Sequence, residues 1–505
     1  MIEIDGHSLS LEQVVRICRR NEKIRLAPAA KIPINRSRAF VDRILEEGRT
    51  VYGITTGVGE LANTLISSEH AEELQQNLIR SHATNVGIPF PEEVVRGIML
   101  LRANALAKGF SGVRLELIQK LLDLLNSRIV PYIPCQGSVG ASGDLSPLSH
   151  LALVLIGEGE CIQDGRRRDA APVLQNAGIQ PLKLRPKEGL ALINGTQVMA
   201  AIGCLVVEDA VLLLKNAQIA GAMSLEALKG TSKALDAKIH AVRPHAGQIR
   251  CAANMRRLVE GSAIIASHAN CDKVQDAYTL RCIPQVYGSI IDTIEYVEKI
   301  LQVEINSATD NPLIFADEEE VISGGNFHGE PLAFAMDFLG IALSEIGNIS
   351  ERTVDRLVNP HVSGLPPFLT EKSGLNSGFM ISQYTAAALV SENKVLAHPA
   401  SVDSIPTSAG QEDHVSMGSI SARHTWDILK NVQHVIAIEF LAAAQGIDFH
   451  PLSPGKGTSA AHEFIRRHVP HLEEDRIMYQ DIEKIIRFVK NGDIVSTVET
   501  EVPEF

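Results

Sequence analysis

Aromatic residues and cysteine are both scarce in this chain of 505 residues. Aromatic residues make up 4% of the chain, so aliphatic side chains must fill most of the core. The seven cysteines form no Cys-x-x-Cys pair, which argues against a disulfide framework and against the common thiolate zinc motifs. We expect most of them to be buried, reduced thiols, at positions 18, 135, 161, 204, 251, 271 and 282.

Metal-binding motifs are lacking as well. The 17 histidines include no His-Glu-x-x-His sequence. The pairs His240/His245 and His468/His471 have no convincing third ligand nearby in the sequence. We therefore expect no metal cofactor.

Positive charge is in short supply, because the net charge is −13 at pH 7. Binding to a nucleic-acid backbone needs a basic face, so a small-molecule partner is the better expectation. An apolar stretch at 205–214 is interrupted by Glu208 and Asp209 and is too short to span a bilayer, so we expect no membrane association. The first five residues carry acids where a secretory signal needs basic residues, which favours a cytoplasmic location.

Helical periodicity is the dominant pattern that is present. The spacing of an amphipathic helix occurs at Ile482, Ile485, Ile486 and Val489. Longer apolar patterns, typical of helices buried among other helices, cover about 197–236, 256–306, 329–358 and 419–445. Glycine and proline punctuate the first 190 residues more densely. We predict a mainly α fold with three parts: an irregular N-terminal domain over 1–190, a large bundle of long helices over 191–450, and a C-terminal helical segment over 451–505.

The run from Gly137 to Pro147 has the composition to build an electrophile from backbone. Glycine lacks a Cβ, so the amide nitrogen of Gly143 can approach the carbonyl carbon of Ala141 with little steric resistance. Cyclisation with loss of water, and loss of a second water from the side chain of Ser142, would give 4-methylideneimidazol-5-one (MIO). We call residues 137–147 the MIO loop. Its end predicts a helix with Ser146 as the cap and Pro147 in the first turn, and the positive end of that helix would favour negative charge on the ring.

Four other segments carry polar groups that an elimination reaction needs. Segment 52–59 places a phenol in a glycine-rich loop, and segment 274–281 offers a guanidinium suited to a carboxylate. Segment 323–328 brings an aromatic ring, and segment 411–414 brings a carboxylate. Taken singly, each segment, like Ala-Ser-Gly itself, is also typical of a turn, a structural side chain or a solvated charge cluster.

Taken together, these segments resemble the aromatic amino acid ammonia-lyase family. The resemblance runs in family order from Tyr52 to His414 and is carried by Ser81-His82, Gly140-Ala141-Ser142-Gly143-Asp144, Asn194-Gly195-Thr196-Gln197, residues 275–281, residues 306–312, Gly324-Gly325-Asn326-Phe327-His328 and Gln411-Glu412-Asp413-His414. It implies a mostly helical fold, an MIO group formed by the chain itself, and a homotetramer whose active sites combine loops from three subunits.

The resemblance implies catalytic roles for Tyr52, Ala141, Ser142, Gly143, Asn194, Tyr278 and Glu412. The Ala-Ser-Gly tripeptide would become MIO. Tyr52 would take the β-proton of the substrate, with its share of that role relative to Glu412 left open. Asn194 would polarise the ring carbonyl, and Tyr278 would support the ring.

The resemblance implies substrate-binding roles for His82, Gln275, Arg281 and Phe327, with Arg281 holding the substrate carboxylate. Buried imidazole nitrogens need polar partners, which His82 and Glu412 would supply. Family members that act on phenylalanine or tyrosine typically have an amide in place of Glu412. The expected reaction is therefore the elimination of ammonia from L-histidine to give trans-urocanate, the first step of histidine degradation.

Two alternatives stay open. Another MIO enzyme, either a tyrosine or phenylalanine ammonia-lyase or a 2,3-aminomutase, would use the same catalytic parts. A catalytically inactive helical scaffold or binding protein would keep the fold without the reaction. Chemically competent residues at every matched position argue against this second alternative.

Overall fold

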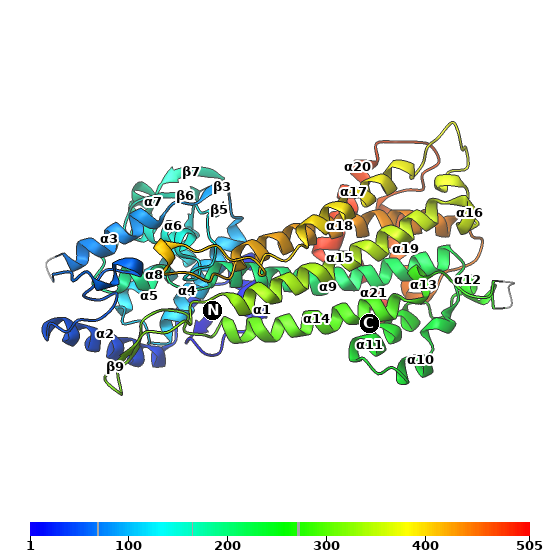
Figure 1. Cartoon of the computed structure of the whole chain (residues 1–505). Helices are drawn as coiled ribbons and strands as arrows, with labels where there is room; N and C mark the ends of the chain where they lie inside the picture. The colour runs from blue at the N-terminus through cyan, green and yellow to red at the C-terminus, as the bar shows by residue number, and fades with distance from the viewer. Residues whose placement is uncertain (68–69, 164, 270–272) are drawn as a thin grey trace. The chain divides into compact units, whose positions relative to one another are not determined.

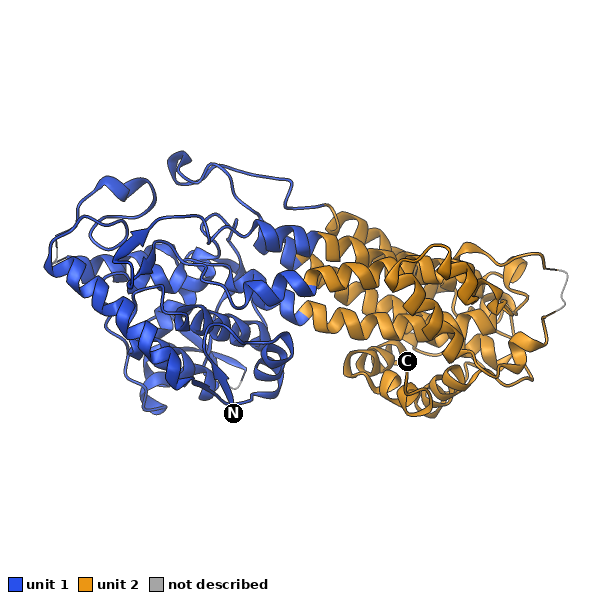
Figure 2. Ribbon diagram, turned by 90° about the horizontal axis from the view of Figure 1, so that it is seen from below, with its two compact units in different colours: residues 1–205, 298–337, 399–423 blue, residues 206–297, 338–398, 424–505 orange. Residues whose placement is uncertain are grey.

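The computed structural model describes residues 1–67, 70–163, 165–269 and 273–505. The described residues form 21 α-helices and a few short strands, and the chain is 61% helical, which confirms the predicted mainly α fold. Two compact units, coloured separately in Figure 2, divide the chain. Unit 1 comprises residues 1–205, 298–337 and 399–423, and unit 2 comprises residues 206–297, 338–398 and 424–505. The division into three consecutive domains stays a prediction.

Unit 1 combines short helices with small sheets (Figure 1). Its helices are α1 (Leu11–Arg20), α2 (Lys31–Glu46), α3 (Ala71–His82), α4 (Glu92–Ala107), α5 (Leu115–Asn126), α6 (Leu145–Leu155), α7 (Ala170–Asn176) and α8 (Glu188–Ile193). Its strands are β1 (Ile2–Ile4), β2 (Ile24–Leu26), β3 (Val86–Pro89), β4 (Val130–Pro131), β5 (Pro134–Gln136), β6 (Glu160–Gln163), β7 (Arg166–Asp169), β8 (Leu313–Phe315) and β9 (Glu320–Ile322). Strands β1 and β2 pair in parallel, whereas β3 with β5, β4 with β6, β6 with β7, and β8 with β9 pair antiparallel.

Unit 2 is helical throughout its described residues. Four of the five chain positions that divide the units lie within long helices: α9 (Gln197–Ala227), α14 (Ile283–Glu304), α15 (Glu330–Val358) and α18 (Gly418–Asp448). The other helices of unit 2 are α10 (Ala237–Ala241), α11 (Ala246–Leu258), α12 (Ala263–Ala266), α13 (Tyr278–Arg281), α16 (Pro360–Ser363), α17 (Met380–Leu396), α19 (Lys456–His468), α20 (Met478–Asn491) and α21 (Asp493–Glu501).

Three of the four predicted long helices form, as α9, α15 and α18. The predicted helix over 256–306 is wrong, because this stretch contains the end of α11 followed by α12, α13 and α14. Gly261 has a left-handed backbone (φ +76°), which ends helical continuity after α11. Pro284 is the second residue of α14, where its missing N–H removes no intrahelical hydrogen bond. Proline here marks a helix start rather than a helix interior.

Each unit has its own aliphatic core. In unit 1, Phe40, Val41 and Ile44 on α2 pack with Ile54 and Ile314. The described cysteines are free thiols, four of them buried, as expected: Cys18, Cys135, Cys161, Cys204, Cys251 and Cys282. Cys271 lies outside the described residues.

Two helices, α9 and α15, are long and apolar enough to cross a membrane by length and composition alone. Within this structure, however, 78% of the most apolar window of α9 and 72% of that of α15 is buried by protein. Burial of this extent is what the central helices of a globular unit show.

A buried carboxyl group lies inside the helices of unit 2. Glu439 on α18 is 1% exposed, and its Oε1 accepts a hydrogen bond from the hydroxyl of Ser224 on α9 (2.9 Å). Burial raises the pKa of Glu439 to about 7, an effect that hydrogen bonds from Ser350 and Ser224 oppose. The folded protein therefore holds this proton at pH values where the unfolded chain has released it, so stability falls as the pH rises from about 4.5 to about 7.

The variant Glu439→Gln should consequently be more stable than the wild type above pH 7, by on the order of 1 kcal/mol, because glutamine keeps the shape without a buried charge. Thermal unfolding at pH 8 and pH 5 measures the effect, and the advantage should shrink at pH 5. Glu483→Gln, an exposed position on α20, is the control and should change neither midpoint. An advantage for Glu439→Gln that grows toward acid pH would contradict the argument.

Candidate active site

A cavity of about 620 Å³ lies in unit 1, lined by the turn that follows α2, by α3, by the MIO loop, by the end of α8 and by residues 407–412. Seven of the eleven residues predicted for the site line it: Tyr52, His82, Ala141, Ser142, Gly143, Asn194 and Glu412. Segments more than 300 residues apart in the sequence therefore meet around the Ala-Ser-Gly tripeptide.

One buried carboxylate, that of Asp144, anchors the MIO loop. Asp144 is fully buried, and its Oδ2 accepts hydrogen bonds from the amides of Val198 (3.0 Å) and Met199 (3.1 Å) in the first turn of α9. Its Oδ1 accepts hydrogen bonds from the hydroxyls of Ser138 and Ser419. Burial raises the pKa of Asp144 to about 6, and these donors oppose the rise. Asp144 thus fastens the loop to the start of α9 and to α18.

Helix α6 begins at Leu145, so the prediction of Ser146 as the cap is wrong: Ser146 is the second residue of the helix. Asp144 occupies the N-cap position without capping the helix through its side chain, because that side chain is turned to α9. Pro147 still lies in the first turn, where proline is tolerated. The MIO loop therefore precedes a helix N-terminus, as the sequence predicts.

Gly143 lies against Gly195 so closely that only glycine fits. A Cβ on Gly143, whose φ is +72°, would lie 2.2 Å from the carbonyl oxygen of Gly195. That carbonyl accepts the amide hydrogen of Asp144 (2.7 Å). The side-chain amide of Asn194 donates to the carbonyl oxygen of Ser142 (3.2 Å), and the buried Oδ1 of Asn194 has no hydrogen-bond partner among the described residues.

These contacts fit an MIO ring formed from this tripeptide. Ring closure from the nitrogen of Gly143 onto the carbonyl carbon of Ala141 keeps the Ser142 carbonyl as the oxygen of the ring. The amide of Asn194 already faces that oxygen, where a hydrogen-bond donor stabilises developing negative charge. The missing Cβ of Gly143 removes the obstacle to the approach of its nitrogen.

A buried arginine that sequence analysis missed lies behind Asn194. Arg102 on α4 is fully buried and donates from Nη1 to the backbone carbonyl of Asn194 (2.6 Å). Burial lowers the pKa of Arg102 to about 10, and the charge of Asp310 opposes that shift. Asp310 also forms a buried ion pair with Lys187 (2.7 Å). A lone arginine inside the apolar stretch 98–106 is the signal that could have revealed this group.

Tyr52 and Glu412 both line the cavity close to Gly59. The amide of Gly59 donates to the phenol oxygen of Tyr52 (3.1 Å), which leaves the phenol hydrogen free for another partner. A Cβ built on Gly59 would lie 3.5 Å from Oε1 of Glu412. Burial lowers the pKa of His82, an effect that the charge of Glu412 partly offsets, so the neutral imidazole of His82 is favoured.

The remaining four predicted residues do not line this cavity. Phe327 belongs to unit 1, and Gln275, Tyr278 and Arg281 belong to unit 2. Tyr278 is 70% exposed, and the guanidinium of Arg281 stacks on its ring at 4.4 Å. No lysine or arginine occurs among the described residues that line the cavity, so unit 1 offers no cation there for a substrate carboxylate.

Comparison with known proteins gives full-length matches. The model of the aromatic amino acid lyase family matches residues 9–467. The histidine ammonia-lyase of Alkaliphilus oremlandii is 57% identical over 99% of this chain and 99% of its own length. The solved histidine ammonia-lyase from Trypanosoma cruzi is 47% identical and superposes with a TM-score of 0.92, covering 99% of this chain and 95% of its own. The tyrosine aminomutase from Streptomyces globisporus is 42% identical with a TM-score of 0.93, covering 99% and 98%.

Proposed function

Because this chain belongs to the aromatic amino acid lyase family, we propose that it eliminates ammonia from L-histidine to give trans-urocanate, the first step of histidine degradation. The protein is a carbon-nitrogen lyase. The contact that carries the mechanism is the hydrogen bond from the Asn194 amide to the Ser142 carbonyl, beside the tightly packed Gly143. A cytoplasmic homotetramer is the form that we propose for the active protein.

The MIO group would form from Ala141, Ser142 and Gly143, as is general in this family. Once formed, it supplies an electrophilic carbon that accepts electrons from the amino acid substrate. Asn194 holds the carbonyl oxygen of Ser142 through a donor that is already in place, and Arg102 fixes the backbone of Asn194 from behind. The amide dipole of Asn194 is therefore already oriented toward this oxygen and does not have to reorient during the reaction.

Proton removal is assigned to Tyr52. Its phenol must first release its own proton to solvent, and the hydrogen bond from Gly59 orients the ring and stabilises the resulting phenolate, which then takes the β-proton. Glu412 also lies close to Gly59 and lines the same cavity, so it is placed to bind an imidazole nitrogen. His82 supplies a second neutral polar group for that ring.

The substrate carboxylate needs a cation, and we assign that role to Arg281 of another copy of the chain. The cavity lining lacks a cation among the described residues, while Val274 and Tyr278 expose 99% and 70% of their surface in the isolated chain. Helix α15 also exposes Phe334, Phe338 and Ile341 at helical spacing, an apolar face suited to assembly. Both observations support a homotetramer with shared active sites.

A complementation experiment tests this sharing. Chains with Ser142→Ala and chains with Arg281→Ala should each be nearly inactive alone. When the two are co-expressed and mix at random, roughly one site in four would combine an intact loop with an intact arginine, and activity should return to that extent. Absence of any recovery in verified mixed oligomers would place both residues in sites of one chain.

Specificity for histidine is tested by Glu412→Gln. Loss of the negative charge that faces an imidazole N–H should lower kcat/KM for L-histidine by about 10- to 100-fold. The activity on L-phenylalanine, which offers no such N–H, should fall less. Glu60→Gln changes another carboxylate that lines the cavity and serves as the matched control, with an expected change of less than about threefold.

The assay of the whole proposal is incubation of the purified protein with L-histidine, L-tyrosine or L-phenylalanine while product absorbance is followed. Urocanate formation as the fastest reaction supports the proposed function. Preferred turnover of an aryl substrate, or formation of a β-amino acid, would identify the lyase or aminomutase alternative. No turnover of any of the three, with MIO absorbance intact, would leave the scaffold alternative.

A further inference from the structure

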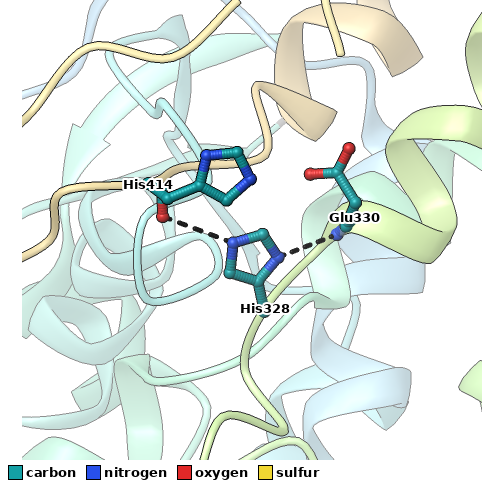
Figure 3. A group of neighbouring side chains, drawn as sticks. All are labelled: His328, Glu330 and His414. Atoms are coloured by element: carbon teal, nitrogen blue, oxygen red, sulfur yellow. Dashed lines mark hydrogen bonds between the residues drawn. The ribbon is translucent and has the colours of Figure 1, made fainter. Parts of the chain in front are cut away.

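Two histidines and a glutamate come together beside the MIO loop, at a place where the sequence shows no metal motif. His328 lies in the segment after β9, Glu330 is the first residue of α15, and His414 lies 84 positions further along. One potential ligand atom from each lies within 4.8 Å of the others (Figure 3). The imidazole rings of His328 and His414 stack at 5.7 Å, with 14° between their planes.

The hydrogen bonds of His328 fix its tautomer and engage both ring nitrogens, so an ion bound at Nδ1 would replace the hydrogen bond from Glu330. Nε2 of His328 lies 3.3 Å from the backbone carbonyl oxygen of His414, so this nitrogen carries the hydrogen. Nδ1 is then the unprotonated nitrogen, and it accepts only a long hydrogen bond from the amide of Glu330 (3.3 Å). A histidine that ligates a metal typically donates its other N–H to a backbone carbonyl, which fixes the tautomer in this way.

Glu330 adds a carboxylate oxygen that lacks a partner. Its Oε2 is buried and accepts no hydrogen bond among the described residues. Figure 3 shows this carboxylate on the same side as the ring of His414, while Nδ1 of His328 points to the backbone nitrogen of Glu330. A cavity of about 480 Å³ opens onto His328 and Glu330, and its described lining holds Glu304 but no lysine or arginine. The cavity leaves room for water, and its charge favours a cation.

We propose that His328, Glu330 and His414 form a binding site for a divalent transition-metal ion, with Zn²⁺ the best match. Two imidazole nitrogens and one carboxylate oxygen are a donor set that Zn²⁺ accepts, with water as the fourth ligand. The ligand atoms close in by rotation of the half-buried and exposed side chains. An ion bound there would link the segment that carries Phe327 to the segment that carries Glu412, outside the reacting tripeptide.

Metal titration of the full-length protein after chelator treatment tests the site without using activity. Isothermal titration with ZnCl₂ should give one ion per chain, and added Zn²⁺ should raise the thermal midpoint. Co²⁺ in place of Zn²⁺ should give the visible absorption of a four-coordinate complex. His414→Asn changes an exposed side chain and Glu330→Gln removes the orphan carboxylate; each should weaken Zn²⁺ binding at least about tenfold.

The matched control is His70→Asn, which removes an exposed histidine that contacts the carboxylate of Glu73 at 3.1 Å. This variant should bind Zn²⁺ like the wild type. The proposal would be overturned if His70→Asn weakened Zn²⁺ binding and His414→Asn left it unchanged. The absence of stoichiometric Zn²⁺ binding to the wild type would also overturn it. Circular dichroism checks that the variants are folded. If His414→Asn is unfolded, and Glu330→Gln is folded but binds Zn²⁺ like the wild type, the proposal is wrong.

Discussion

Ser142→Ala is expected to abolish the lyase activity, with a loss of about 10⁴-fold or more, the scale seen when the central reactive group of an enzyme is removed. Alanine has no hydroxyl to leave, so the exocyclic methylidene carbon of MIO cannot form. The near-ultraviolet absorbance of MIO should disappear together with the activity. The fold should persist, because the contacts that hold the loop come from the carboxylate of Asp144 and from backbone groups.

Ser146→Ala is the matched control for this variant. Ser146 also lines the cavity, and its hydroxyl hydrogen-bonds only to Thr84, through the amide (3.1 Å) and the hydroxyl (3.2 Å) of that residue. The absorbance of MIO should therefore survive in Ser146→Ala. Full activity in Ser142→Ala, or equal loss of absorbance in both variants, would remove the ring from the mechanism.

Tyr52→Phe is expected to lower kcat by about 10³-fold with little change in KM, because a general base contributes to the transition state rather than to substrate binding. Phenylalanine keeps the ring that fills this part of the cavity and removes only the oxygen to which Gly59 donates. The absorbance of MIO should remain unchanged, which separates the effect from that of Ser142→Ala. Steady-state kinetics together with an absorbance spectrum of the same sample measure both quantities.

The control is Tyr132→Phe, a tyrosine of unit 1 outside the cavity, whose ring packs under the guanidinium of Arg167 at 3.9 Å. Its kinetics should match those of the wild type. If Tyr52→Phe keeps most of its kcat while Glu412→Gln loses about 10³-fold, the proton is taken by Glu412 instead. The two variants thus decide a question that the sequence leaves open.

Sequence patterns predict those parts of the molecule whose cause is local. Apolar residues at helical spacing predict α9, α15 and α18 because these helices are buried on most of their faces. The prediction of one helix over 256–306 fails because Gly261 and Pro284 interrupt the helix, although the apolar pattern continues past both residues. The spacing of apolar residues shows which positions are buried. It does not show where a single glycine or proline ends a helix.

In the candidate site, too, some residues can be predicted from the sequence and others cannot. Family motifs led to the tripeptide and to Asn194, since these residues are contiguous and chemically unusual in combination. No motif predicts Arg102, because its role depends on a contact with the backbone carbonyl of Asn194, 92 positions away in the sequence. Arg281 belongs to unit 2 and does not line the cavity of unit 1, so its proposed role in the site of another copy cannot be tested within one chain.

The anchoring of Asp144 has a consequence for how the enzyme matures. The carboxylate binds amides 54 and 55 positions away in the sequence and a hydroxyl 275 positions away. The native conformation of the loop that carries the Ala-Ser-Gly tripeptide therefore forms only after the first turns of α9 and α18 have docked. On the proposed chemistry, ring closure would come last and would be irreversible, so the absorbance of MIO would count the molecules that had once reached the native state, even after they later unfold.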